Sequence, residues 1–308
     1  MAETSDKQAH EARRCGFVAV IGAPNSGKST LTNALVGTKV AIVTHKAQTT
    51  RGPVRGIAPV GNSQIILVDT PGIFQPKWRL DRAMFGAAWD RAGDADLVAL
   101  VIDAQRGLDK SLDPLLNHLP EVRRPIIAIL NKIDQVSKPE LLRLAADVSA
   151  VRPFERTFML SALTGDGVAD LKSYLADAVP PGPWLFPEDQ LTDVSLRHAA
   201  AEITREKLFM RLHDELPYSL TVETADWKEL QDGSVRIEQT IYVMRESQRK
   251  ILLGAKGATI KEISMAAREE IGQMVEAPVH LFLFVKVRER WGEDPERYRE
   301  MGLDYPKE

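Results

Sequence analysis

The chain has 308 residues, of which 44% are hydrophobic and 27% charged, with a formal net charge of −3. This length predicts about two domains, and the composition is that of a globular protein with hydrophobic cores, which excludes a disordered or collagen-like chain. The acidic balance excludes nucleic-acid binding through overall charge, so a basic binding surface has to be local. Cys15 is the only cysteine, which excludes an intramolecular disulfide and fits a reducing compartment.

The N-terminal residues 1–14 are polar and mixed in charge. They lack the apolar stretch of a signal peptide, so we expect a flexible tail on a cytoplasmic protein. The apolar runs further along have the length of strands and are too short to cross a bilayer. Peripheral contact with the inner face of the cell membrane stays open.

Short apolar runs alternate with amphipathic stretches through residues 15–179, the predicted first domain. The apolar runs predict strands over residues 17–21, 64–68, 97–102, 126–130 and 156–160. The amphipathic stretches predict helices over residues 28–36, 79–91, 111–119, 139–150 and 168–178. This alternation favours an α/β fold whose mostly parallel sheet is covered by helices on both faces.

Prolines mark the end of the first domain, with four of them in residues 180–187. Proline fixes φ and removes a donor, so residues 180–193 are predicted to form a stiff linker. Residues 194–290 then predict a smaller α+β domain, and residues 291–308 a C-terminal extension. The expected elements of the α+β domain are a helix (194–216), two strands (218–227, 234–244), two helices (247–253, 259–276) and a strand (280–287).

Residues 22–29 read GAPNSGKS, directly after a predicted strand and at the start of a predicted helix. Glycines let backbone N–H groups turn toward phosphate oxygens, and the helix N-terminus favours anions. Lys28 is predicted to reach the β- and γ-phosphates, and Ser29 to supply a hydroxyl to Mg²⁺. The alternative is an ordinary glycine turn. The predicted phosphate-binding residues are Gly22, Ala23, Pro24, Asn25, Ser26, Gly27, Lys28, Ser29 and Thr30.

Two further segments predict the magnesium side of the site. DTPG at residues 69–72 follows a predicted strand, so Asp69 is expected to hold Mg²⁺ and the Gly72 N–H to sense the γ-phosphate. In the polar loop of residues 38–55, Thr50 is predicted to close on Mg²⁺ and the γ-phosphate, with Thr49 as the alternative.

NKID at residues 131–134 selects the base. The Asp134 carboxylate can accept hydrogen bonds from guanine N1–H and its amine, whereas adenine would leave it unpaired. Asn131 is predicted to tie the loops together, and the stem of Lys132 to lie over the base. Ser161 and Ala162 complete the set, and the Ala162 N–H is expected to meet the guanine carbonyl.

These motifs resemble those of the Era family of translation-associated GTPases. The phosphate loop, KAQTTR at residues 46–51, DTPG, NKID and WGEDPERYREMGL at residues 291–303 match the family's pattern, and the resemblance covers nearly the whole chain. It implies a Ras-like P-loop GTPase domain followed by a type II KH RNA-binding domain. It also implies a monomer that binds small-subunit ribosomal RNA near its 3′ end and assists small ribosomal subunit assembly, with RNA binding coupled to the GTP/GDP state.

Two positions bear on catalysis. Many small GTPases orient the attacking water with a glutamine after D-x-x-G, but this chain has Ile73, so slow intrinsic turnover is expected. Asn25 resembles the asparagine through which related GTPases bind K⁺, whose charge can replace an arginine finger. The predicted cofactors are therefore Mg²⁺, GTP or GDP, and K⁺, and the predicted catalytic residues are Lys28, Thr50, Gly72 and Asn25.

GAKG at residues 254–257 matches the helix–turn–helix loop of a KH domain, where glycines permit close approach to a sugar-phosphate backbone. Residues 245–261 carry five basic residues and one acidic residue, a net charge of +4 that favours RNA. Ile251, Leu252 and Ile260 are predicted to form the floor under the bases. The predicted RNA-binding residues are Arg249, Lys250, Gly254, Ala255, Lys256, Gly257, Ile260 and Lys261.

Two other functions stay open. In the first, RNA binding is the protein's activity, and the bound nucleotide serves only as an occupancy signal. The second is a tRNA-modification GTPase, which needs a different partner domain, and the KH pattern argues against it.

Overall fold

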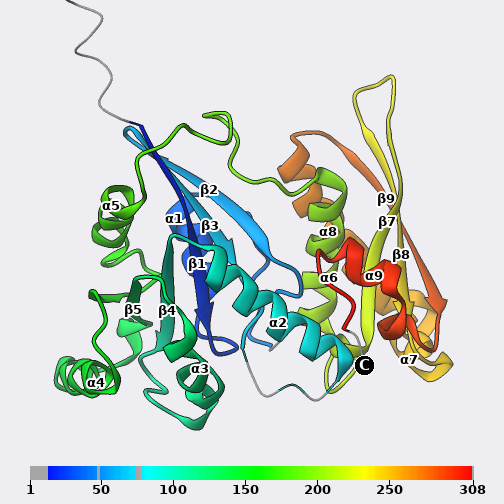
Figure 1. Cartoon of the computed structure of the whole chain (residues 1–308). Coiled ribbons are helices and arrows are strands. Elements are labelled where there is room, and N and C mark those ends of the chain that lie inside the picture. The colour runs from blue at the N-terminus through cyan, green and yellow to red at the C-terminus, as the bar shows by residue number, and fades with distance from the viewer. Residues whose placement is uncertain (1–12, 47–48, 74–75, 77, 307–308) are drawn as a thin grey trace, which may run out of the picture. The chain divides into compact units, whose positions relative to one another are not determined.

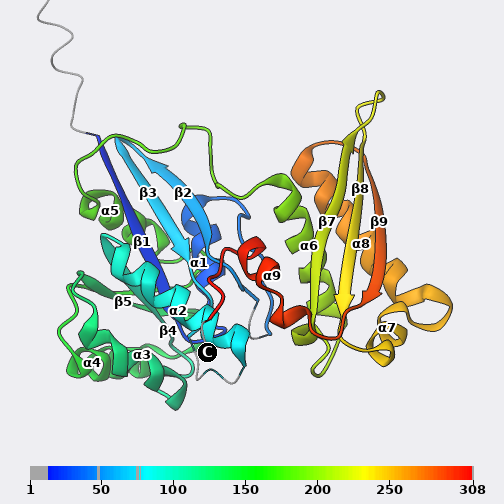
Figure 2. The ribbon, with the colours of Figure 1, turned by 45° about the vertical axis from the view of Figure 1, so that its right-hand side comes forward.

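The computed structural model describes residues 13–46, 49–73, 76 and 78–306. They form two compact units. The first contains residues 13–41, Thr50–Asp193 and the C-terminal residues from Met301, and the second contains Ile42–Thr49 and Val194–Glu300. Figures 1 and 2 show the elements of each unit.

The sheet of the first unit has the strand order β2-β3-β1-β4-β5-β6. Its strands are β1 (Arg14–Gly22), β2 (Val54–Val60), β3 (Ser63–Asp69), β4 (Leu97–Asp103), β5 (Ile126–Asn131) and β6 (Thr157–Leu160). Every neighbouring pair is parallel except β2 and β3, which confirms the predicted mostly parallel α/β sheet. The edge strand β2 was not predicted, because Gly56 and Pro59 interrupt its apolar pattern and an edge strand tolerates proline.

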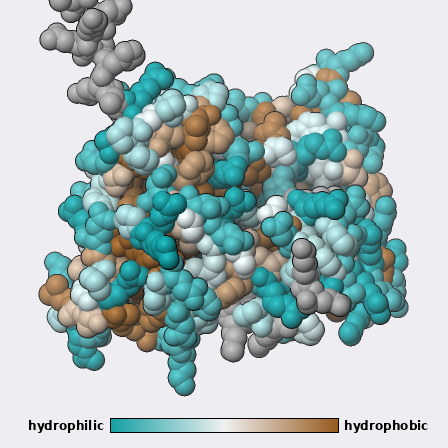
Figure 3. Space-filling model, in the orientation of Figure 1, coloured by the Kyte–Doolittle hydropathy of each residue, from teal (hydrophilic) through white to brown (hydrophobic). Residues whose placement is uncertain are grey.

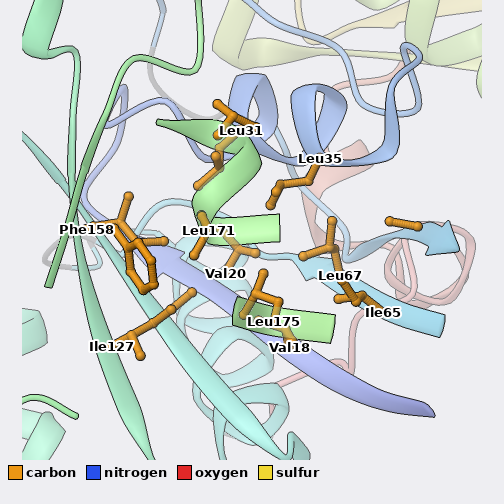
Figure 4. Packing of buried hydrophobic residues seen from close by; sticks show 14 of the residues in the cluster. Val18, Val20, Leu31, Leu35, Ile65, Leu67, Ile127, Phe158, Leu171 and Leu175 are labelled. Carbon is orange, nitrogen blue, oxygen red and sulfur yellow. The ribbon is translucent and has the colours of Figure 1, made fainter. Parts of the chain in front are cut away.

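Helices cover both faces of this sheet, as predicted (Figure 1). On one face lie α1 (Lys28–Val36) and α5 (Val168–Ala178), and on the other α2 (Arg79–Asp94), α3 (Asp113–His118) and α4 (Lys138–Val151). Figure 4 shows Leu31 and Leu35 of α1 and Leu171 of α5 packed over the strand residues Val18 and Val20. The helix predicted over residues 111–119 is shorter, since α3 is flanked by 3-10 turns at Lys110–Leu112 and Leu119–Glu121.

The proline-rich stretch of residues 180–193 lies along the β2–β3 edge of the same unit. The fully buried Gln64 of β3 accepts hydrogen bonds from the Leu185 and Phe186 N–H groups (2.9 and 3.1 Å) and donates to the Phe186 carbonyl (2.8 Å). The Ile57 N–H of β2 donates to the Leu191 carbonyl at 2.8 Å. The stretch therefore protects an edge that would otherwise expose unpaired backbone groups.

The second unit has a sheet of order β7-β8-β9, in which β7 and β8 are antiparallel and β8 and β9 parallel. In chain order its elements are α6 (Leu196–Arg211), β7 (Leu220–Glu229), β8 (Val235–Val243), α7 (Glu246–Leu253), α8 (Ala258–Val275), β9 (Val279–Val287) and α9 (Pro295–Glu300). Leu208 of α6 and Ile263 of α8 pack against Ile241 of β8. This is the predicted type II KH order. The first helix ends earlier than predicted because Leu212 is extended.

Hydrophilic side chains dominate the face shown in Figure 3, with smaller hydrophobic patches among them. In the part of the chain that the structure describes, no helix has the length and apolar character needed to span a membrane.

Candidate functional site

The phosphate loop joins β1 to α1 at the carboxyl edge of the sheet. Asn25 and Gly27 have positive φ angles of 64° and 95°, and a Cβ at Gly27 would collide with the Asn131 side chain, so only glycine fits there. Lys28 is buried at 5% exposure, and its Nζ donates to the carbonyls of Gly22 (3.3 Å) and Ala23 (3.0 Å). Burial lowers the pKa of Lys28 to about 8, and the charge of Asp69 opposes this shift. The Lys28 ammonium therefore points into the loop, where a bound anion could replace the two carbonyls as its hydrogen-bond acceptor.

The structure brings together the three predicted metal ligands. Ser29 Oγ donates to Asp69 Oδ2 at 2.6 Å, and Thr50 Oγ1 lies 2.9 Å from Ser29 Oγ and 3.2 Å from Asp69 Oδ2. Asp69 is fully buried, and its Oδ1 has no hydrogen-bond partner among the described residues. Burial raises the pKa of Asp69, while Lys28 and the two hydroxyls lower it. Two hydroxyls and a carboxylate are hard oxygen donors that fit Mg²⁺.

Thr49 does not join this set. Its hydroxyl donates to the Lys46 carbonyl at 2.8 Å and lies 2.7 Å from the Thr44 hydroxyl. The geometry therefore favours Thr50, the first choice from the sequence, over Thr49.

Gly72 and Ile73 pack directly against the phosphate loop. A Cβ at Gly72 would lie 2.8 Å from Pro24 Cα, and the Ile73 N–H donates to the Gly22 carbonyl at 3.0 Å. The Ile73 side chain is 1% exposed and belongs to the core beneath α2. The side chain therefore faces the core, and the expectation that another group positions the water stays a prediction.

Asn131 ties three loops together, as predicted. Its Nδ2 donates to the Ser26 carbonyl of the phosphate loop at 2.9 Å, and its Oδ1 accepts from the Ala162 N–H at 3.0 Å. The N–H predicted to meet the guanine carbonyl is thus bonded to Asn131, because the β5 and β6 loops close on each other. A guanine carbonyl at Ala162 has to share or replace that bond. Ser161, next to it, is fully buried.

Lys132 and Asp134 lie in the loop that follows β5. Asp134 is exposed within a 3-10 turn, Ile133–Gln135, where its carboxylate can meet a base. Lys132 has a left-handed backbone (φ 67°), and its Nζ donates to the Asn25 carbonyl at 2.7 Å and to Asp103 Oδ2 at 2.6 Å. Asp103 was not among the residues predicted from the sequence.

The predicted RNA loop joins α7 to α8. Gly254, Lys256 and Gly257 all have positive φ angles (72°, 51° and 78°), and the short 3-10 turn Ala255–Gly257 separates the helices. A Cβ at Gly254 would collide with the Thr259 side chain, so the first glycine of the loop is required.

The side chains around this loop divide into exposed and buried ones. Lys250, Lys256 and Lys261 are exposed, whereas Arg249 pairs with Glu246 at 2.9 Å. Ile251 is 60% exposed and Ile260 is half-buried, but Leu252 is fully buried in the core, so its prediction as a floor residue is wrong.

Comparison with known proteins agrees with the prediction of a GTPase domain followed by a KH domain. Residues 17–132 match the family model of a 50S ribosome-binding GTPase, and residues 215–292 that of a KH domain. The chain is 62% identical to GTPase Era of Brucella suis biovar 1 (strain 1330) over 293 residues, which cover 95% of this chain and 94% of the relative. The chain belongs to the GTPase Era family. A second relative, GTPase Era of Rhizobium meliloti (strain 1021), is 61% identical over 294 residues, 96% of this chain and 94% of its own length.

Solved Era structures share the fold. Aquifex aeolicus Era bound to GDP·AlF4⁻ matches with a TM-score of 0.89 at 37% identity, over 94% of this chain and 99% of that one. Era in complex with MgGDPNP and nucleotides 1506–1542 of 16S ribosomal RNA matches with a TM-score of 0.90 at 37% identity, over the same shares. As an Era-family member the chain is a GTPase, with a Ras-like P-loop domain followed by a KH domain.

Proposed function

We propose that this GTPase binds small-subunit ribosomal RNA near its 3′ end through its KH domain and assists small ribosomal subunit assembly. RNA binding is coupled to the GTP/GDP state. The observation that carries the proposal is the set of exposed lysines on and beside the loop of residues 254–257 (Lys250, Lys256 and Lys261), on a KH fold in the same chain as a full set of nucleotide-site loops. A solved Era holds MgGDPNP together with nucleotides 1506–1542 of 16S ribosomal RNA, which supports the choice of RNA.

The described residues divide the work on the nucleotide. Lys28 moves from the loop carbonyls onto the β- and γ-phosphates, and Asp134 accepts hydrogen bonds from the guanine edge. Ser29, Thr50 and Asp69 hold Mg²⁺, which when bound neutralises charge on the phosphates. Thr50 and Gly72 lie on two different loops that meet at the γ-phosphate. Loss of that phosphate releases both loops, which gives the chain two states.

We propose that K⁺ assists hydrolysis through Asn25. The residue is exposed in the phosphate loop and already has the left-handed backbone that glycine and asparagine adopt most readily. We expect faster GTP turnover in K⁺ than in Na⁺. Asn25→Gly keeps the backbone freedom and removes the amide, so it should abolish the difference, whereas equal rates of the unaltered protein in both salts would discard the idea.

One titration tests the coupled function. Binding of RNA matching the 3′ end of small-subunit ribosomal RNA is measured against a scrambled RNA, with a GTP analogue, with GDP and without nucleotide. We expect tight binding only for the matching RNA with the GTP analogue. Equal affinity for both RNAs would refute the RNA assignment, and equal affinity in all nucleotide states would refute the coupling.

The alternative in which nucleotide is only an occupancy signal makes a different prediction. At GTP concentrations that still saturate the site, a Lys28→Ala or Asp69→Asn variant that binds GTP but no longer hydrolyses it would then still support subunit assembly in cells. We expect assembly to fail, because in the coupled function hydrolysis releases the RNA.

We also propose that the protein is a cytoplasmic monomer that can contact the inner face of the membrane peripherally. The single cysteine and an RNA partner support the compartment. Light scattering tests the mass, and flotation with vesicles of anionic lipid tests the contact.

A further inference from the structure

Asp103 is a buried carboxylate next to the nucleotide loops to which neither the motifs nor the comparisons give a role. It is the last residue of β4, and in the parallel register it lies opposite Asn131, the last residue of β5. The residue is 7% exposed. Its two oxygens have separate partners, since Oδ1 accepts from the Gln105 N–H at 3.0 Å and Oδ2 forms the ion pair with Lys132 at 2.6 Å.

This ion pair fixes a side chain that is otherwise mobile. A lysine has four rotatable bonds, and ordering it on ligand binding costs conformational entropy. Lys132 Nζ donates to both Asp103 Oδ2 and the Asn25 carbonyl, so the end of the Lys132 side chain is fixed beside the phosphate loop. The Lys132 side chain is 27% exposed and that of Asp103 only 8%, so solvent screens the pair less than a surface salt bridge.

We propose that Asp103 is a positioning residue of the guanine-nucleotide site, which fixes the end of the Lys132 side chain before the base arrives. The inference rests on the proposed guanine-nucleotide function and on the sequence-based prediction that the Lys132 stem lies over the base. Asp103 itself contacts neither base nor phosphate in this scheme. It acts on affinity for all guanine nucleotides, whereas the choice of base stays with Asp134. Preorganisation of this kind raises affinity by lowering the cost of binding.

A double-mutant cycle tests the proposal. Dissociation constants and dissociation rates of fluorescent GDP and a GTP analogue are measured for the unaltered chain, Asp103→Asn, Lys132→Ala and the double variant. Asn keeps the acceptor for the Gln105 N–H. We expect Asp103→Asn to weaken both nucleotides by the same factor of about 10, mostly through faster dissociation. In the Lys132→Ala background the same change should have an effect of less than about 2-fold.

Asp96→Asn is the matched control. Asp96 directly precedes β4, at the opposite end of the strand, and its carboxylate also accepts a backbone hydrogen bond, from Phe17 N–H at 2.8 Å. This variant should bind nucleotide like the unaltered chain. The ratio of GDP to xanthosine diphosphate affinity should stay unchanged in Asp103→Asn and collapse in Asp134→Asn, since only Asp134 reads the base.

The outcomes separate two failures. If Lys132→Ala weakens binding but Asp103→Asn does not, or weakens it equally with and without Lys132, the positioning role is refuted. Binding that is unaffected by Lys132→Ala and by Asp134→Asn refutes the nucleotide-site assignment itself, and the positioning role with it.

Discussion

Asn131→Ala removes the side chain that joins the phosphate loop to the loop after β6. Asn131 is 2% exposed, and the change deletes its hydrogen bonds to the Ser26 carbonyl (2.9 Å) and from the Ala162 N–H (3.0 Å). Each bond leaves a buried backbone group unpaired, at a cost of about 1–2 kcal/mol. We therefore expect the free energy of unfolding to fall by about 2–4 kcal/mol.

The same change should weaken nucleotide binding. If about 2 kcal/mol of loop ordering has to be supplied by the ligand instead, dissociation constants for GTP and GDP rise about 30-fold. Urea denaturation of the nucleotide-free protein measures the first effect, and titration with fluorescent GDP measures the second.

Gln64→Ala is the control for this experiment. Gln64 is another buried amide that bonds to backbone, but its partners Leu185 and Phe186 belong to the proline-rich stretch, and Asp69 lies at the other end of β3. The variant should lose comparable stability and keep its nucleotide affinity. An Asn131→Ala protein with lower stability but unchanged nucleotide affinity would show that Asn131 stabilises the fold and does not preorganise the loops for nucleotide binding.

Three further predictions concern the magnesium side, the water and the RNA loop. Asp69→Asn should lower the GTP affinity measured with Mg²⁺ to the value that the unaltered chain shows in EDTA, and a retained Mg²⁺ dependence would exclude Asp69 as a ligand. Ile73→Gln should lower the free energy of unfolding by about 2–4 kcal/mol, because it buries an amide in the core, and it should not raise GTP turnover. Thermal melting measures the first effect and phosphate release the second. Faster GTP turnover would refute the placement of residue 73 in the core. Lys256→Ala and Lys261→Ala should each reduce the slope of log affinity for RNA against log salt concentration by about 0.7 per lost phosphate contact. Lys228 is exposed on β7, and Lys228→Ala should leave this slope unchanged. Equal slopes for all three variants would show that residues 256 and 261 do not contact the RNA.

The nucleotide loops were predictable because each motif directly follows a buried parallel strand. The carboxyl ends of such strands meet at one edge of the sheet, so GAPNSGKS, DTPG and NKID had to come together. The bonds of Asn131 to both neighbouring loops confirm the tie expected from the sequence. The roles of these residues in binding stay predictions that the experiments above test.

Side-chain pairings across the sheet were not predictable in the same way. Asp103 and Lys132 are 29 residues apart and follow different strands, and no local pattern sets the rotamer that joins them. Leu252 shows the limit from the other side. It follows Ile251 on α7, and successive helical residues point about 100° apart, so the two side chains need not share an environment: Ile251 is exposed and Leu252 is buried. The apolar pair alone did not indicate which one is buried.

Ile73 shows how a local structural demand and a catalytic one exclude each other. Its N–H bonds to the Gly22 carbonyl while its side chain fills the core with Ile21 and Ala23. The neighbouring Gly72 packs against Pro24 and so lies beside the phosphate loop. A glutamine at this position would have to leave the core to reach a water, and the loop would lose its hydrophobic anchor. We propose that K⁺ held at the phosphate loop, where Asn25 is exposed, supplies charge that stabilises the transition state. The K⁺ dependence of the Asn25→Gly variant is consequently the measurement that most directly tests how this site hydrolyses GTP.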